Sequence, residues 1–161
     1  MTASVEQIRA SIVALLPRLR RFARVITRHR EDADDLVQLA IERALLRHTQ
    51  WQQEQRFESW VFGILRNAWI DEIRARKRRA AVLAPEEDAS TVADSSVAAH
   101  DDLLAVQEAM HGLPEEQRLA VALVLIEGLS YKEAAAALEI PQGTLTSRLA
   151  RGREALQAQL Q

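Results

Sequence analysis

The sequence contains no cysteine, and this absence excludes several kinds of chemistry. Disulfide bonds, thiolate zinc sites and cysteine nucleophiles all require a thiol. Histidines are few, and their spacing is not typical of a metal site: they are His29, His48, His100 and His111. No pair of titratable side chains has the spacing of a catalytic site. We therefore expect no metal, no cofactor and no catalytic residue.

Long apolar runs are also lacking. No stretch approaches the roughly 18 uninterrupted apolar residues that a membrane-spanning helix needs. Residues 1–10 have no basic segment followed by an apolar core, as a signal peptide would. We expect a cytoplasmic chain with no membrane insertion of its own.

Basic residues are missing from the middle of the chain, which the net charge of −2 conceals. Residues 1–79 carry 16 Lys and Arg against 10 Asp and Glu, whereas residues 80–100 carry four acids and no base. Residues 101–161 carry five bases and nine acids. Such a basic half is typical of a surface for nucleic acid or an acidic partner, although a solvated basic face would give the same count.

Hydrophobic residues make up 48% of the chain and recur at helical spacing. Before residue 79, apolar side chains three or four positions apart predict three amphipathic helices. These helices occupy about residues 5–26, 33–45 and 57–68. Pro17 interrupts the first, so we expect a kink or a second helix start there. The polar segment 48–55 is predicted to be a loop.

The periodicity fails over residues 80–100, where small and acidic residues dominate, and this predicts a flexible linker. It returns in residues 101–161, where a helix is expected to run to about Glu127. The predicted fold class is all-α. Two small helical domains, residues 1–79 and 101–161, would flank the linker, which is long enough for either a compact or an open arrangement.

The end of the chain has the proportions of a helix-turn-helix, with a short helix, a tight turn and a long helix. Ser130 and Glu133 have the spacing of a capping box at the start of the short helix. The long helix is expected to bury Leu145, Leu149, Gly152 and Leu156. Its outward residues would be Gly143, Ser147, Ala150 and Arg151, with Thr146 and Arg148 on the flanks. These side chains suit a DNA major groove, although a surface helix with a few arginines fits the same spacing.

A second candidate site is the basic run 74–79, which follows several aromatic residues on the third helix. Basic side chains neutralise phosphates and aromatic rings stack on unpaired bases, so this combination suits an opened DNA strand. Phe57 and Trp60 fall on the predicted core face and have packing as their alternative role. Trp69 and Ile73 are expected to point away from that face. The helix dipole alone also favours a basic C-terminus.

Five segments, in a consistent order through both domains, carry a resemblance to one family. They are 32–38 (DADDLVQ), 57–67 (FESWVFGILRN), 112–118 (GLPEEQR), 127–134 (EGLSYKEA) and 140–149 (IPQGTLTSRL). They resemble the polymerase-binding and minus-ten helices of sigma region two, and then sigma region four, which reads the minus-thirty-five element. The absence of a domain between them resembles the extracytoplasmic-function (ECF) class, and residues 16–23 and 34–38 look similar to its EcfG-like general-stress branch.

The resemblance implies three partners: core RNA polymerase, through its beta-prime and beta subunits, promoter DNA, and an anti-sigma factor that holds the protein inactive until a stress signal. The residues implied in polymerase binding are Asp34, Asp35, Gln38 and Glu42. A solvated acidic helix start is the alternative for these side chains, because the helix dipole favours acids there.

The resemblance also implies a set of DNA contacts. The residues concerned are Arg56, Asn67, Arg74, Lys77, Arg78, Thr146, Ser147, Arg148 and Arg151, with Ala150 beside them. The loop 48–56 would hold a flipped minus-ten base, and Arg148 would contact phosphate. Asp71, which also matches the family pattern, has a structural role as its alternative.

The chain departs from the family pattern in two places. Leu39 and Ala40 replace the usual glutamate and threonine, which predicts a less acidic or partly apolar polymerase-facing surface. Thr146 stands where lysine or arginine is frequent, which should weaken phosphate binding. A conventional repressor or activator is the rival interpretation, and it would bind duplex DNA tightly without polymerase, usually as a dimer.

Overall fold

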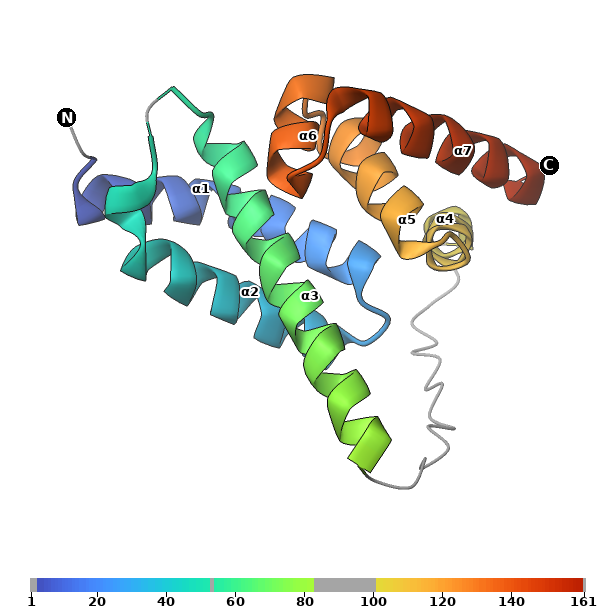
Figure 1. Cartoon of the computed structure of the whole chain (residues 1–161), viewed down its shortest axis with the longest axis horizontal. Coiled ribbons are helices and arrows are strands. Elements are labelled where there is room, and N and C mark those ends of the chain that lie inside the picture. Colours follow the sequence, from blue (N-terminus) through green and yellow to red (C-terminus); the bar gives the residue numbers. More distant parts are fainter. Residues whose placement is uncertain (1–2, 53, 83–100, 161) are drawn as a thin grey trace.

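The computed structural model describes residues 3–52, 54–82 and 101–160, with only the backbone for residues 101–104. Every regular element in these ranges is helical, which confirms the predicted all-α class (Figure 1). The elements are α1 (Val5–Ile26), α2 (Arg30–Leu46), the 3₁₀ turn η1 (His48–Gln50), α3 (Phe57–Val82), α4 (Asp101–His111), α5 (Glu115–Val121), the π-helical turn η3 (Ala122–Ile126), α6 (Tyr131–Leu138) and α7 (Gln142–Leu160).

The N-terminal lobe consists of α1, α2 and α3, which pack around one apolar core. At its centre the rings of Phe22 and Phe62 meet edge to face, with centroids 5.2 Å apart. Aromatic pairs prefer this geometry because the positive ring edge meets the negative ring face. The third helix continues to Val82, three residues beyond the boundary predicted for this domain, and the rest of the predicted linker lies outside the described residues.

The predicted second helix start at Pro17 is wrong, because α1 runs as one helix from Val5 to Ile26 with Pro17 inside it. Proline has no N–H to offer the carbonyl of Val13, one turn earlier. The side chain of Val13 is 68% exposed, and Pro17 is exposed as well. The unpaired carbonyl therefore faces water, which can supply the missing hydrogen bond.

One aromatic position differs from expectation. Trp69 is only 8% exposed, so the prediction that it points away from the core is wrong, and the guanidinium of Arg76 lies 5.5 Å from its ring centroid. Phe57 and Trp60 are half-buried and pack against the core together with Trp51, which agrees with their predicted packing role. Among these side chains the ring of Phe57 lies 5.3 Å from Trp51 and 5.9 Å from Trp60.

The C-terminal lobe consists of α4 to α7, and α7 packs along α5. Leu145, Leu149 and Gly152 are buried as predicted, whereas Leu156 is half-buried. Between α6 and α7 the chain turns at Glu139, whose φ of 56° lies in the left-handed region. This turn sets the two helices of the predicted helix-turn-helix against each other.

The expected helix to Glu127 is not a single α-helix, because α5 ends at Val121 and the π-helical turn η3 follows. The backbone N–H of Glu127 donates to the carbonyl of Ala122, at 2.9 Å. Gly128 then adopts φ of 74°, which glycine tolerates, and the chain leaves the helix there. Hydrophobic periodicity does not distinguish one π turn from the end of an α-helix.

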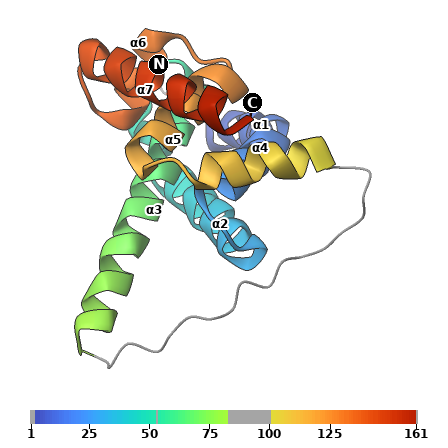
Figure 2. The ribbon, with the colours of Figure 1, turned by 90° about the vertical axis from the view of Figure 1, so that its right-hand side faces the viewer.

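The two lobes pack directly against each other. Of the compact and open arrangements that the sequence allowed, the structure has the compact one. Figure 2 shows α6 and α7 over one end of α3, and α4 beside α1. Gly63 of α3 meets the backbone of α6, since a Cβ there would lie 3.2 Å from the carbonyl oxygen of Ala137. The buried hydroxyl of Ser59 donates to the carbonyl of Glu133 at 2.7 Å. Among the described residues, no helix has the length and apolarity needed to cross a membrane.

The fold predicts that Gly152→Ala destabilises the C-terminal lobe by about 1–3 kcal/mol, the usual cost of overpacking. The added Cβ would lie 2.6 Å from Cγ2 of Val121 and 3.4 Å from the carbonyl oxygen of Gln117. Gly143→Ala is the matched control in α7, because nothing lies within 4 Å of its added Cβ. Urea denaturation checks the pair, and equal midpoints would contradict the packing of α7 on α5.

Candidate nucleic-acid interface

The exposed face of α7 presents the predicted base-reading residues together. Thr146, Ser147, Ala150 and Arg151 are all exposed. The hydroxyl of Thr146 donates to the carbonyl of Gln142 at 2.9 Å, and that of Ser147 to Gly143 at 3.1 Å. Both hydroxyl oxygens keep lone pairs that can accept from a base amino group. Apart from Arg151, the side chains on this face are short.

Arg148 has a different setting from its neighbours on α7. It is half-buried, and its Nη2 lies 3.6 Å from Oε2 of Glu116. The phosphate contact predicted for this arginine would therefore have to compete with an acid of its own lobe.

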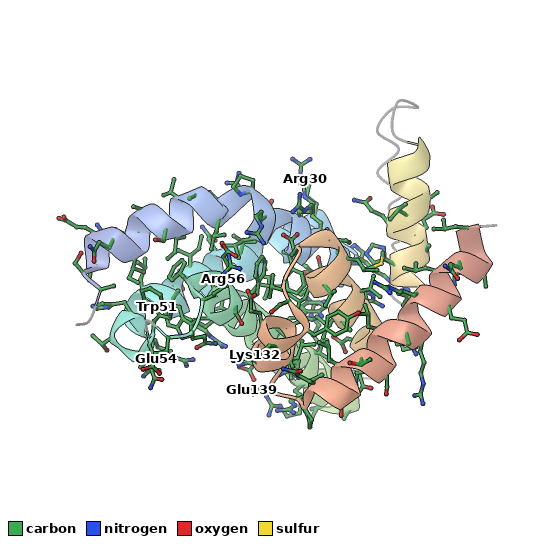
Figure 3. All side chains as sticks on the ribbon, turned by 90° about the horizontal axis from the view of Figure 1, so that it is seen from above. Arg30, Trp51, Glu54, Arg56, Lys132 and Glu139 are labelled. Atoms are coloured by element: carbon green, nitrogen blue, oxygen red, sulfur yellow. The ribbon has the colours of Figure 1, made fainter. Side chains whose placement is uncertain are left out.

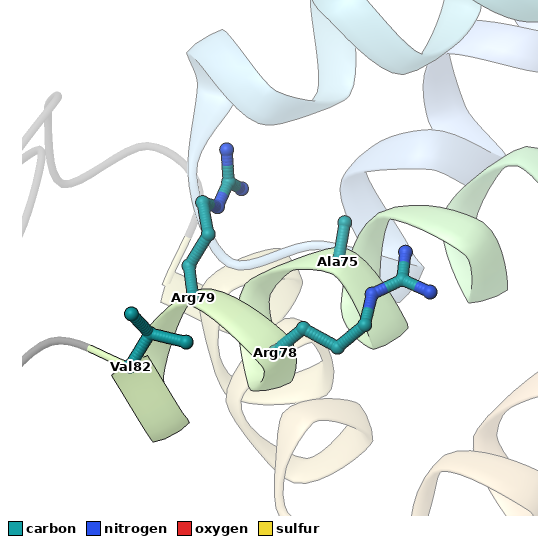
Figure 4. Close-up of a pocket in the computed structure, with 4 residues that line it drawn as sticks. All are labelled: Ala75, Arg78, Arg79 and Val82. Carbon is teal, nitrogen blue, oxygen red and sulfur yellow. The ribbon is translucent and has the colours of Figure 1, made fainter.

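At the basic end of α3, some side chains form ion pairs within the protein and others do not. Arg76 donates to Asp32 at 2.8 Å and to Glu72 at 3.0 Å, and these bonds, led by the one to Asp32, raise its pKa. Arg79 also donates to Glu72. In Figure 4, Arg78 and Arg79 leave the helix in different directions.

Three basic side chains of α3 stay open to an external anion: Arg74, Lys77 and Arg78. All are exposed, and no carboxylate in the described part of the chain lies within 4 Å of their charged groups. Asn67, one helix segment earlier, is half-buried, and its Oδ1 accepts from Nη1 of Arg66 at 2.9 Å. Three of the four α3 side chains predicted for DNA are thus free to bind it.

A groove of about 370 Å³ runs between the lobes, and it brings predicted contacts of different promoter elements together. Arg74 and Lys77 of α3 line it alongside Arg148 of α7. Glu115 and Glu139 contribute acids to the same groove. The packed arrangement therefore places residues predicted for the minus-ten and minus-thirty-five elements on one small surface.

Two side-chain hydrogen bonds to backbone carbonyls form among the described residues at and beside the loop 48–56. Nδ1 of His48 donates to the carbonyl of Leu45 at 2.9 Å, and Nε1 of Trp51 donates to that of Gln55 at 2.9 Å. Figure 3 shows Trp51 and Glu54 on the same side of the view, at the loop. Arg56 is exposed, yet it pairs with Glu58 at 3.2 Å and with Glu133 of α6 at 3.4 Å.

That contact explains why the predicted capping box forms only by half. The Ser130 hydroxyl accepts from the backbone N–H of Glu133 at 3.1 Å, as predicted. The carboxylate of Glu133 lies instead against Arg56, so it joins α6 to the N-terminal lobe.

The acidic face of α2 is open in this packed form. Asp34, Asp35, Gln38 and Glu42 are all exposed. Of the two residues expected to make the surface beside them less acidic or partly apolar, Ala40 is fully buried in the core and cannot contribute, whereas Leu39 is half-buried and keeps part of its side chain exposed.

Asp71 bridges two helices of the N-terminal lobe. Its Oδ2 accepts from Nη1 of Arg43 at 3.0 Å, which joins α3 to α2. This geometry supports the structural alternative for Asp71.

Two further groups that the sequence did not single out join the lobes. Nε2 of His111 lies 3.0 Å from the carbonyl of Thr27 and 3.3 Å from that of Arg24, and burial lowers the pKa of the imidazole. Arg18 and Arg21 of α1 bind the carboxylate of Glu127, whose side chain is completely buried. Residues so far apart in the chain give no local signal of their contact.

Two family models match this chain, one in each lobe. Residues 12–79 match the model of Sigma-70 region 2, and residues 103–156 match that of Sigma-70, region 4. The chain is 34% identical over 155 residues to the ECF RNA polymerase sigma factor EcfG of Rhodopseudomonas palustris, covering 96% of this chain and 86% of the relative. The protein belongs to the ECF RNA polymerase sigma factors.

Other members support the same assignment. SigM of Mycobacterium tuberculosis is 39% identical over 138 residues, covering 86% of this sigma factor and 69% of the relative. The sigma factor RpoE of Bartonella quintana, solved in complex with the anti-sigma factor NepR, superposes with a TM-score of 0.80 at 30% identity and covers 96% and 97% of the two chains. CnrH, solved with the cytosolic domain of CnrY, shares the fold with a TM-score of 0.74 at 23% identity, covering 98% and 90%.

The close approach at Gly63 predicts that Gly63→Leu separates the lobes of this sigma factor, because the new side chain must occupy the space of the Ala137 backbone. The absence of native cysteine allows two dyes to be placed at Glu6→Cys and Glu154→Cys for energy transfer. Transfer efficiency should fall in the Gly63→Leu protein. Gly143→Leu, with open space around its Cβ, should leave it unchanged, and an equal fall in both would contradict the role of Gly63.

Proposed function

We propose that this sigma factor docks on core RNA polymerase through α2 and directs initiation at promoters read by α3 and α7, with no catalysis of its own. The observation that carries the proposal is the presence of separate exposed surfaces of the required chemistry: an acidic face on α2, open basic side chains on α3, and a hydroxyl and arginine face on α7. Since polymerase and promoter meet in the cytoplasm of a bacterium, we place its action there.

Asp34, Asp35, Gln38 and Glu42 are the proposed polymerase contacts. They follow one exposed helix face, and the carboxylates suit basic side chains on a partner. The helix stands on a core that includes Leu36 and Val37, so its exposed face is rigid.

Asp35→Arg should abolish binding to core polymerase and with it promoter-specific transcripts. The substitution replaces a carboxylate in the proposed contact by a positive charge, which repels the basic side chains of the partner. Glu6→Arg makes the same charge change at an exposed site of the same lobe and should bind normally. Pull-down by purified core polymerase and abortive transcription on a promoter library measure the two effects. Equal binding of both variants would remove α2 from the interface.

Thr146, Ser147, Ala150 and Arg151 are the proposed readers of the minus-thirty-five element. An arginine on a groove-facing helix can bind guanine O6 and N7 together, whereas hydroxyl groups bind several bases. Arg148 would leave Glu116 and turn to phosphate when DNA is bound.

Arg151→Ala should lower transcription from a promoter that needs its minus-thirty-five element by about tenfold to a hundredfold, the usual loss for one specific base contact. Arg153→Ala removes the same charge two positions along α7, on another side of the helix, and should have little effect. Binding to core polymerase serves as the internal standard and should not change. Equal losses for both variants would indicate a charge effect without base reading.

The proposed minus-ten surface combines the loop at 48–56 with the outer side of α3. Arg56, Asn67, Arg74, Lys77 and Arg78 would follow the opened strand, with arginine and lysine on phosphates. The half-exposed rings beside the loop provide faces on which a base could stack. Abortive transcripts from a pre-melted template would test whether this surface acts in melting.

The packed lobes cannot read both promoter elements at once. The elements lie about 25 base pairs apart, or roughly 85 Å of duplex. Thr146 is nine residues from Ala137, at most about 34 Å along the chain, and Lys77 lies about 21 Å along the helix from Gly63. Because Gly63 touches Ala137, the two reading surfaces are too close, so the lobes must separate on the promoter.

We further propose an anti-sigma partner that holds the factor inactive until a stress signal. Support comes from the relative of Bartonella quintana, which was solved with its anti-sigma factor and superposes over almost the whole chain. A conventional repressor or activator is the rival, and it would bind duplex DNA tightly without polymerase. Promoter-specific transcripts that require both core polymerase and this chain would exclude that rival.

A further inference from the structure

The contact of Arg18 and Arg21 with Glu127 has the geometry of a carboxylate-binding site. Arg21 binds both oxygens, with Nε 2.8 Å from Oε1 and Nη2 2.9 Å from Oε2. Arg18 donates from Nε to Oε2 at 3.1 Å and from Nη2 to the backbone carbonyl of Glu127 at 2.7 Å. The carboxylate is fully buried, although Arg21 itself is 52% exposed. The hydrogen bond to Glu127 raises the pKa of Arg21, whose guanidinium is charged at neutral pH in any case.

The receiving side of this site is built by the N-terminal lobe alone. Arg18 and Arg21 stand three residues apart on α1 and so share a helix face. The guanidinium of Arg18 lies 5.5 Å from the ring centroid of Phe62, and its Nη1 lies 3.6 Å from Oε2 of Glu58. These partners all belong to α1 and α3, so they continue to orient Arg18 when the C-terminal lobe leaves.

The occupant has a recognisable form. Glu127 follows the π-helical turn directly, and its own carbonyl accepts from Arg18. The site therefore selects an acidic residue at the C-terminal end of a helix, with one arginine binding both its side chain and its backbone. A planar carboxylate fits the bidentate fork of Arg21. A phosphate group would lack the neutral carbonyl that Arg18 also binds, so the site favours an acidic residue over a phosphate.

Separation of the lobes removes Glu127 and leaves two adjacent guanidinium groups without their acid. We propose that Arg18 and Arg21 form an exchange site, in which an acidic residue at a helix end of core RNA polymerase replaces Glu127 when this factor opens. The site would thus hold the closed form in the free protein and help to hold the open form on polymerase. This inference rests on the proposed function, because opening on polymerase is what empties the site.

The test measures the affinity of the full chain for core polymerase in the absence of DNA. Glu127→Gln weakens closure and should tighten binding to core polymerase by about tenfold. In the unaltered chain the charge-assisted hydrogen bonds of Glu127 stabilise the closed form, and this reduces the apparent affinity of the open form for polymerase. Adding Arg21→Ala to Glu127→Gln should then weaken binding by about tenfold, because Glu127→Gln has already removed the charge-assisted bond that Arg21 gives to closure, so the main loss is the bond to the partner's acid. If both proteins bind equally, the arginine serves closure alone and the inference is overturned.

Two further variants in the Glu127→Gln background separate other causes. Arg20→Ala removes a neighbouring exposed charge on α1 and should not change the affinity. Arg21→Lys keeps the charge but loses the planar fork, so it should lose most of the affinity that Arg21→Ala loses. If Arg20→Ala weakens binding as much as Arg21→Ala, general electrostatic attraction explains the effect and the exchange site is excluded.

Other outcomes remain distinguishable. An effect of Arg21→Ala that emerges only with promoter DNA present would identify a phosphate as the ligand and overturn the inference. Failure of the unaltered chain to bind core polymerase would instead overturn the proposed function. Circular dichroism melting of each variant checks that the measured change is not caused by loss of folding. Because the side chain of Arg21 is 52% exposed, Arg21→Ala is expected to fold.

Discussion

One helix has to bury two opposite faces, and the arrangement of the whole protein depends on it. Around Phe62, consecutive residues of α3 are buried: Val61, Phe62, Gly63, Ile64 and Leu65. A helix that is buried at every successive position is packed on all sides. Here α1 and α2 cover one side and α6 the other, with Gly63 allowing the backbones of α3 and α6 to approach. The core of the N-terminal lobe and the contact with the C-terminal lobe are therefore supported by the same turns of one helix.

Local sequence signals predicted most of the helices but not the interruptions within them. The three-to-four spacing of apolar residues was sufficient for α1, α2 and α7, because each buries a continuous stripe, and it also located the first part of α3. Pro17 does not start a second helix, because the effect of a proline depends on whether the freed carbonyl reaches water, which only the tertiary structure decides. The sequence did not predict the π-helical turn before Glu127, because such a turn changes the hydrogen-bond register of the backbone without changing the composition of the segment.

The exposed faces were more predictable than the contacts between lobes. Inward leucines on α7 determine by helical geometry which side faces outward, so Ser147, Ala150 and Arg151 could be placed from spacing alone. Trp69 was misplaced because α3 lacks a single apolar stripe and its wheel has no clear outer side. Glu127 resembled an ordinary surface acid in the sequence, since its arginine partners precede it by 106 and 109 residues.

The acidic face of α2 is exposed while the lobes are still packed, and this has a consequence for the order of events in the proposed function. Core polymerase can make its first contact with the closed protein, without waiting for a rare open form to arise. Opening would then follow as a separate first-order step within the encounter complex. The rate of holoenzyme formation should accordingly rise with polymerase concentration and then level off at the rate at which α6 leaves α3.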